Sequence, residues 1–158
     1  MTQLQAIRKF ADIAAGTHVT IARNRDDWGM GLSDLKHPRL ILPTDTNKND
    51  ISDRQFRFDF VSRCPLARGF ANVTISILHE IGHYYHPIEY FITDPEVYRN
   101  AIDFDHFNLP CERVATDWAI QWLQDANNRK IAKAFERAYF GHTQGCVRAG
   151  GLNKIVIK

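Results

Sequence analysis

The sequence predicts an α+β domain: an N-terminal helix, a short mixed or antiparallel sheet, and then a helical half. Three observations predict this fold class. Apolar residues recur at helical spacing near the N-terminus, two short segments before residue 43 are typical of strands, and helical spacing returns after residue 73. No repeat or low-complexity linker divides the 158 residues, a length typical of one domain. We therefore expect residues 1–158 to form a single domain.

The first helix and two strands follow from local patterns. Helical spacing links five apolar residues near the N-terminus, Leu4, Ile7, Phe10, Ala11 and Ala14. Gly16 then provides a natural C-terminal stop. Residues 17–23 are β-branched and alternating, which predicts a strand. Residues 39–42 form a second apolar run between Pro38 and Pro43, and we expect this strand at a sheet edge because prolines cannot donate ladder hydrogen bonds.

The second half of the chain predicts four helices. Residues 44–70 give no clear assignment, but residues 73–86 form a central helix that Pro87 prevents from continuing. The sequence Asp-Pro-Glu at residues 94–96 predicts a short helix to about residue 102. Another helix starts around residues 108–110, and a last one ends near residue 141. Their apolar stripes contain Val114, Ala115, Trp118, Ala119, Trp122 and Leu123, and then Ile131, Phe135, Ala138 and Tyr139.

Composition excludes several classes of protein. Twenty Lys and Arg residues oppose eighteen Asp and Glu residues, and a net charge of +2 does not indicate a nucleic-acid-binding protein. The apolar stretches are far shorter than the roughly 18 residues that span a bilayer, and no secretory signal is visible. Three cysteines are too few and too scattered for a disulfide framework. We expect a cytoplasmic protein without a membrane partner, and we do not expect a nucleic-acid partner.

The most specific motif lies on the predicted central helix. Residues 79–83 read His-Glu-Ile-Gly-His, which is the HExxH pattern. Two histidines four residues apart lie on one helical face, so His79 and His83 can bind the same ion. Zinc lowers the pKa of a bound water to about 7, and Glu80 beside that face can accept the proton as this water attacks a carbonyl. The pattern predicts one Zn²⁺ per chain, with Glu80 as the catalytic residue.

A catalytic zinc usually has a third protein ligand. Glu112 is the best candidate, because it lies near the start of a second helix that has Ala115 and Ala119 on the same stripe. Small side chains there would let that helix approach the first closely. Glu89 has the spacing of the extended HExxHxxGxxH motif, but His86 replaces its glycine. Other candidates are His86 itself, which has poor reach, and three residues of a predicted loop, Asp103, Asp105 and His106.

Two segments together resemble a known family. The run His-Glu-Ile-Gly-His-Tyr-Tyr-His at residues 79–86, followed by Glu112, Ala115, Trp118 and Ala119, is similar to the ImmA/IrrE family of zinc metallopeptidases. The similarity covers about residues 72–125, with Trp118 where the family commonly has Phe. It implies a gluzincin-like site with His79, His83 and Glu112 as zinc ligands and Glu80 as general base. Members are often encoded near phages or mobile elements and cleave a helix-turn-helix repressor. The resemblance therefore implies a regulatory protease of a phage or mobile element, with a transcriptional repressor as the protein substrate.

Two functional hypotheses follow. The first is a zinc metallopeptidase that hydrolyses a peptide bond through a zinc-activated water. The alternative is a zinc-binding regulatory module that docks to a protein or DNA partner without turnover. The strand at residues 39–42 could hold an extended peptide by main-chain pairing, or could be a plain edge strand. The residue that stabilises the oxyanion stays open among Tyr84, Tyr85, His86, His106, Tyr139 and His142.

Overall fold

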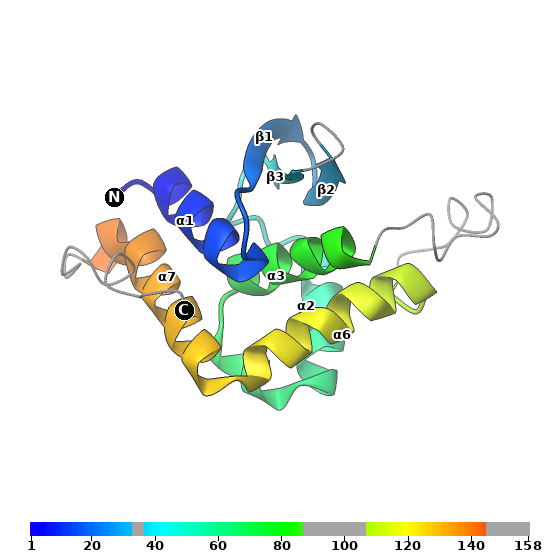
Figure 1. Ribbon diagram of the computed structural model, residues 1–158. Coiled ribbons are helices and arrows are strands. Elements are labelled where there is room, and N and C mark those ends of the chain that lie inside the picture. Colours follow the sequence, from blue (N-terminus) through cyan, green and yellow to red (C-terminus); the bar gives the residue numbers. More distant parts are fainter. Residues whose placement is uncertain (33–36, 87–106, 145–158) are drawn as a thin grey trace.

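The computed structural model describes residues 1–32, 37–86 and 107–144. Within these residues it contains five α-helices, one 3₁₀ helix and three strands (Figure 1). In chain order they are α1 (Gln3–Ala15), β1 (Thr20–Arg25), β2 (Gly29–Leu32), β3 (Pro38–Pro43), α2 (Ile51–Arg63), the 3₁₀ helix η1 (Pro65–Gly69), α3 (Asn72–Tyr85), α6 (Pro110–Gln124) and α7 (Ala126–Gln144). This order confirms the α+β fold class. The helix predicted at residues 95–102 lies outside the described residues.

Helix α1 begins and ends where the sequence predicts. The Thr2 hydroxyl accepts a hydrogen bond from the Gln5 backbone, and the Gln5 side chain accepts one from the Thr2 backbone, which completes a capping box. Gly16 ends the helix with a φ of 68°, a left-handed conformation that glycine adopts without strain. The apolar stripe of α1 is buried, including Phe10, which stacks on Phe135 of α7 at a centroid distance of 4.4 Å.

The sheet is mixed, and its strand order is β1-β3-β2. Strand β3 pairs parallel with β1 and antiparallel with β2. The prediction that residues 39–42 form an edge strand was therefore wrong, because β3 is the central strand. Its prolines are the first and last residues of the strand, where Pro38 pairs with Leu32 and Pro43 with Arg25. The residues between them keep the N–H groups that a central strand needs.

Two elements had no clear signal in the sequence. Strand β2 contains Gly29 and Gly31, and glycine is unfavourable in strands. It forms through its pairing with β3. Helix α2 lies within residues 44–70, for which the sequence predicts no clear structure, and Phe60 is its only buried residue. A helix that buries so little of its surface shows no continuous apolar stripe.

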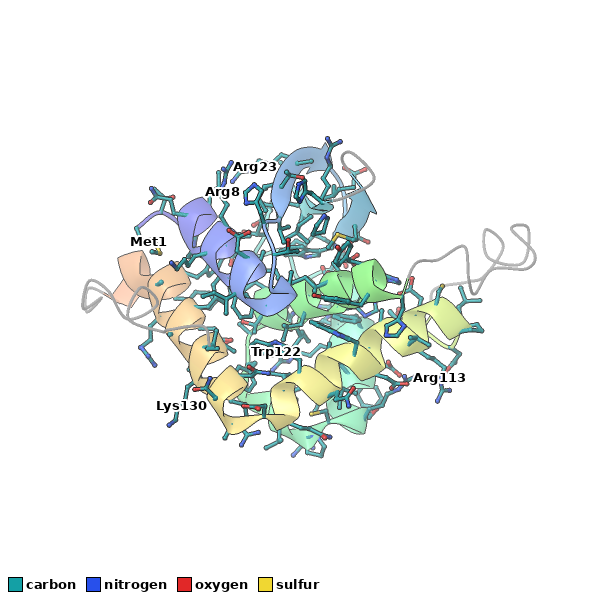
Figure 2. All side chains as sticks on the ribbon, in the orientation of Figure 1. Met1, Arg8, Arg23, Arg113, Trp122 and Lys130 are labelled. Carbon is teal, nitrogen blue, oxygen red and sulfur yellow. The ribbon has the colours of Figure 1, made fainter. Side chains whose placement is uncertain are left out.

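Helix α3 lies at the centre of the described fold. Figure 1 shows it with the sheet and α1 on one side and α6 running alongside it on the other. Ten of its residues are buried, among them His79 and His83. Figure 2 shows Trp122 of α6 pointing into the interior, where its ring lies edge-on to Phe10, whereas Arg113 of the same helix points outward. None of the described helices is long and apolar enough to cross a membrane.

The first turn of α3 is capped by a residue from another helix. Its N-cap, Ala71, has no side chain that can accept a hydrogen bond. The Glu136 carboxylate of α7 replaces this cap, because one of its oxygens lies 2.7 Å from the Ala71 nitrogen and 2.6 Å from the Thr74 hydroxyl. Helix α7 therefore fixes the position at which the helix with the HExxH motif begins.

Candidate metal centre

The two histidines of the HExxH motif face the same point from successive turns of α3. His79 is 6% exposed and His83 is 8% exposed. Their Nε2 atoms lie 3.1 Å apart, and their rings are nearly perpendicular at 89°. Burying two imidazoles beside each other is unfavourable unless their nitrogens find partners. An N–H···N hydrogen bond between the two rings can satisfy one nitrogen of each, and a third group at the same point would satisfy them further.

Glu112 provides the anionic group from the first turn of α6. One of its carboxylate oxygens lies 2.8 Å from His79 Nε2 and 3.0 Å from His83 Nε2. The side chain is buried, with 5% of the residue exposed. Ala115 and Ala119, whose small size was expected to allow a close approach of this helix, are fully buried. The structure thus brings together the three side chains named as ligands from the sequence.

The geometry of these three atoms fits a divalent metal ion. Ligand atoms about 2.0–2.2 Å from a tetrahedral zinc lie roughly 3.3–3.6 Å apart, so shifts of a few tenths of an ångström from the present distances would suffice. Three contacts join these atoms, but the two imidazole nitrogens carry at most one hydrogen each, so hydrogen bonds cannot satisfy all three contacts at once. A cation placed between the atoms can accept a lone pair from each of them. Imidazole and carboxylate ligands suit zinc and other divalent transition metals. His79, Glu80 and His83 also present ligand atoms within 4.8 Å of one another.

Glu80 lies beside the histidines and lines the cavity in front of them. Burial raises the pKa of its carboxyl group above the usual range, although positive charge on His83 and His79 acts in the opposite direction. For His83, burial by itself lowers the pKa, but the hydrogen bond that its ring donates to the Glu112 carboxylate and the charge of Glu80 outweigh it, so the pKa is raised. Metal binding at this centre must therefore release any proton that His83 carries.

The cavity at the centre has a volume of about 400 Å³. Helix α3 forms one wall of the cavity. A second wall comes from the β1–β2 turn and the start of β2, a third from α2, and a fourth from the start of α6. The lining residues outside α3 are Asp27, Trp28, Gly29, Met30, Ser52, Asp53, Phe56, Phe107 and Glu112. A space of this size accepts a few side chains of an extended peptide.

Sequence reasoning missed two residues that contact His79. The Thr116 hydroxyl of α6 lies 3.0 Å from His79 Nδ1. The Phe56 ring of α2 meets the His79 ring edge-on, at a centroid distance of 5.0 Å. Thr116 could have been found, because it lies one turn after Glu112 on the same helical face. Phe56 could not, because its segment had no assigned structure.

The structure also locates some of the other residues considered as a third metal ligand or as the residue that stabilises the oxyanion. Glu89, Asp103, Asp105 and His106 lie outside the described residues. His86 is the C-cap of α3 and is not part of the buried group that could hold a metal. Among the oxyanion candidates, the Tyr85 hydroxyl donates to the Ala15 carbonyl, and the Tyr139 hydroxyl bonds to Thr46 and Asn47.

Comparisons with protein-family models, with curated proteins and with solved structures find no match to this chain. The candidate site therefore rests on its own geometry and on the motif.

Proposed function

We propose that this protein is a zinc metallopeptidase of the ImmA/IrrE type that hydrolyses a peptide bond in a protein substrate. One observation carries the proposal: two buried imidazoles and the Glu112 carboxylate converge within 3.1 Å, at a cavity that Glu80 also lines. A His₂Glu ligand set leaves a coordination position open, as catalytic zinc sites do, whereas structural zinc sites are closed and commonly rich in cysteine.

The residues of the site have distinct roles in this proposal. His79, His83 and Glu112 hold the ion. A zinc ion bound there supplies a Lewis acid that lowers the pKa of water and polarises a peptide carbonyl. Glu80, which lines the cavity without being needed as a ligand, accepts the proton of the attacking water and delivers it to the leaving nitrogen.

The cavity wall at β2 supports a peptide as the substrate. Among the described strands β2 pairs only with β3, so its other edge has backbone groups that an extended peptide could pair with. Residues 27–30 of this region line the cavity. Strand β2 therefore takes over the role first considered for residues 39–42. The family resemblance extends the proposal to a transcriptional repressor, cleaved in the cytoplasm.

Zinc analysis and peptide cleavage together test the proposal. We expect about one zinc per chain by elemental analysis, lost or greatly weakened in Glu112→Ala. A peptide mixture from digested bacterial proteins, read by mass spectrometry, should show new cleavage sites with the zinc-loaded protein. Glu80→Gln should keep the zinc and lose cleavage.

Three results would contradict parts of this proposal. Equal cleavage by Glu80→Gln would exclude Glu80 as the base. Full zinc retention in Glu112→Ala would move the third ligand elsewhere, with Glu89 the next residue to test. Bound zinc without cleavage of any peptide or folded repressor would favour the zinc-binding docking module.

A further inference from the structure

Helix α6 contacts both nitrogens of the His79 ring. Glu112 lies 2.8 Å from Nε2, and Thr116, one turn later on the same helix, lies 3.0 Å from Nδ1. Thr116 is 3% exposed, so water has little access to its hydroxyl. The two contacts fix both ends of the imidazole, and the edge of Phe56 limits rotation of the ring plane.

We infer that Thr116 is a positioning residue that orients His79 for metal binding. The inference rests on the proposed function, because it assigns Thr116 a task only if His79 is a ligand. A neutral imidazole carries one hydrogen on its two ring nitrogens, so a histidine that binds a cation through Nε2 carries that hydrogen on Nδ1. The Thr116 hydroxyl can accept a hydrogen bond from it.

A hydroxyl suits this position better than a carboxylate or an amide nitrogen. It can accept a hydrogen bond from Nδ1 when the metal is bound, and it can donate to Nδ1 when Nε2 carries the hydrogen toward Glu112. Thr116 therefore keeps the ring in one orientation in both states. Partners of this kind typically contribute a factor of 10–100 to metal affinity.

The second histidine lacks an equivalent contact within the described residues. His83 Nδ1 is buried and has no hydrogen-bond partner there. The two motif histidines therefore differ: Thr116 fixes His79, whereas only the Nε2 side of His83 is held, by Glu112. Loss of the Thr116 hydroxyl should affect His79 specifically.

Three variants of Thr116 separate its hydroxyl from its volume. Thr116→Val keeps the shape and removes the hydroxyl, Thr116→Ser keeps the hydroxyl, and Thr116→Ala tests the loss if valine prevents folding. Thr74→Val is the matched control, because Thr74 is equally buried on α3 but bonds to Glu136 rather than to a motif histidine. Zinc affinity is measured by competition with a chromophoric chelator, and folding by circular dichroism.

We expect zinc affinity to fall about 10–100-fold in Thr116→Val and Thr116→Ala. Thr116→Ser and Thr74→Val should stay within about threefold of the unsubstituted protein, a difference too small to reflect the loss of such a partner. The second readout is NMR of the zinc-loaded protein, in which the His79 Nδ1 hydrogen should be observed as a slowly exchanging resonance. This resonance should be lost in Thr116→Val and kept in Thr116→Ser.

The outcomes distinguish this inference from the proposed function. Unchanged zinc affinity and an unchanged Nδ1 resonance in Thr116→Val would overturn the role of Thr116 and leave the zinc site standing. Equal losses in the serine and valine variants would overturn it too, because the hydroxyl would then be irrelevant. Failure of the unsubstituted protein to bind zinc would overturn both.

Discussion

A Cβ atom on Gly82 would overlap the carbonyl oxygen of Ala115 and lie 2.9 Å from the Ala115 Cα atom. The backbones of α3 and α6 are therefore too close at this point for any side chain at residue 82. Gly82 immediately precedes His83, and Ala115 lies one turn after Glu112. The absence of a side chain at residue 82 thus sets the separation of the two helices that carry the candidate ligands.

Gly82→Ala should destabilise the protein and weaken metal binding. Alanine favours a helix by about 1 kcal/mol over glycine, but the clash is with backbone and cannot be relieved by a change of rotamer. Overpacking of this kind costs about 1–3 kcal/mol, or more. Because α6 must move away, Glu112 should leave the histidines, and zinc affinity should fall at least tenfold. Thermal unfolding and chelator competition measure the two effects.

Gly69→Ala is the control for this prediction. Its Cβ would lie 3.8 Å from the Lys133 ammonium nitrogen, an ordinary contact with a flexible side chain. We expect little change in stability or zinc affinity. Equal zinc affinity in Gly82→Ala and the unsubstituted protein would show that the close helix contact is not needed for the site.

Local patterns predict the elements that bury a continuous stripe. Helix α1 buries seven residues at the helical spacing that predicted it. Helix α3, predicted at residues 73–86, buries ten residues. Helix α2 buries one residue fully, and β2 is half glycine, so neither has a local signal. The central position of β3 depends on its pairing with β2, which no local pattern shows.

The candidate site also contains some residues that the sequence predicts and others that only the tertiary structure brings together. His79 and His83 follow from helical geometry within one segment, and Glu112 from a second helix with small residues on its stripe. Phe56 and the residues of the β1–β2 turn reach the cavity only through the tertiary arrangement. The sequence predicts the side chains that would bind the metal and leaves most of the cavity wall undefined.

Glu136→Ala should destabilise α3 at its first turn. The carboxylate is 13% exposed and accepts hydrogen bonds from the Ala71 nitrogen and the Thr74 hydroxyl, and its removal leaves the buried Thr74 hydroxyl and the partly buried Ala71 nitrogen without this acceptor. Such a loss costs about 1–3 kcal/mol. Urea denaturation measures it. Glu136→Gln keeps an oxygen acceptor, so its free energy of unfolding should fall less than that of Glu136→Ala. An equal fall in the two variants would contradict a capping role.

Protonation of Asp50, the N-cap of α2, should lower the stability of the protein in acid. Asp50 accepts a hydrogen bond from the Asp53 nitrogen, and this bond, with the nearby Lys48, lowers the pKa of Asp50. A pKa that is lower in the folded chain means that ionised Asp50 stabilises the fold. This stabilisation is complete above the unfolded value of about 3.9 and is lost as the pH falls through the folded pKa.

The test compares the unsubstituted protein with Asp50→Asn from pH 7 to pH 3. Asparagine caps a helix about as well as aspartate but does not titrate. The free-energy difference between the two should be constant above about pH 5 and shift in favour of the variant below pH 4. Burial raises the pKa of Asp53, an effect of opposite sign, but Asp53 is present in both proteins. A difference independent of pH would contradict the assignment to Asp50.

The charges around the cavity should favour basic peptides. Four carboxylates line it, those of Asp27, Asp53, Glu80 and Glu112, and no Lys or Arg does so among the described residues. A bound zinc ion would offset the charges of Glu112 and Glu80, which leaves Asp27 and Asp53 as the negative groups of the lining. Lys48 is the nearest balancing charge, 3.3 Å from Asp27 and 3.0 Å from Asp53, but it also faces Asp50. One cation among the carboxylates of Asp27, Asp50 and Asp53 leaves this side of the cavity negatively charged. If the protein cleaves peptides, those with Lys or Arg near the scissile bond should be cleaved faster than those with Glu.

Asp27→Asn tests this preference at the most accessible of these charges. The Asp27 side chain is 66% exposed, so its removal should not impair folding. An interaction of at most about 1 kcal/mol in water corresponds to a roughly fivefold change in kcat/KM for the basic peptide, and added salt should reduce it. Asp59→Asn is the control, because Asp59 pairs with Arg63 on α2 and does not line the cavity. The quantity to compare is the ratio of kcat/KM for the Lys-containing peptide to kcat/KM for the Glu-containing peptide. If Asp27→Asn leaves this ratio as unchanged as Asp59→Asn does, the charge of the cavity wall does not select the substrate.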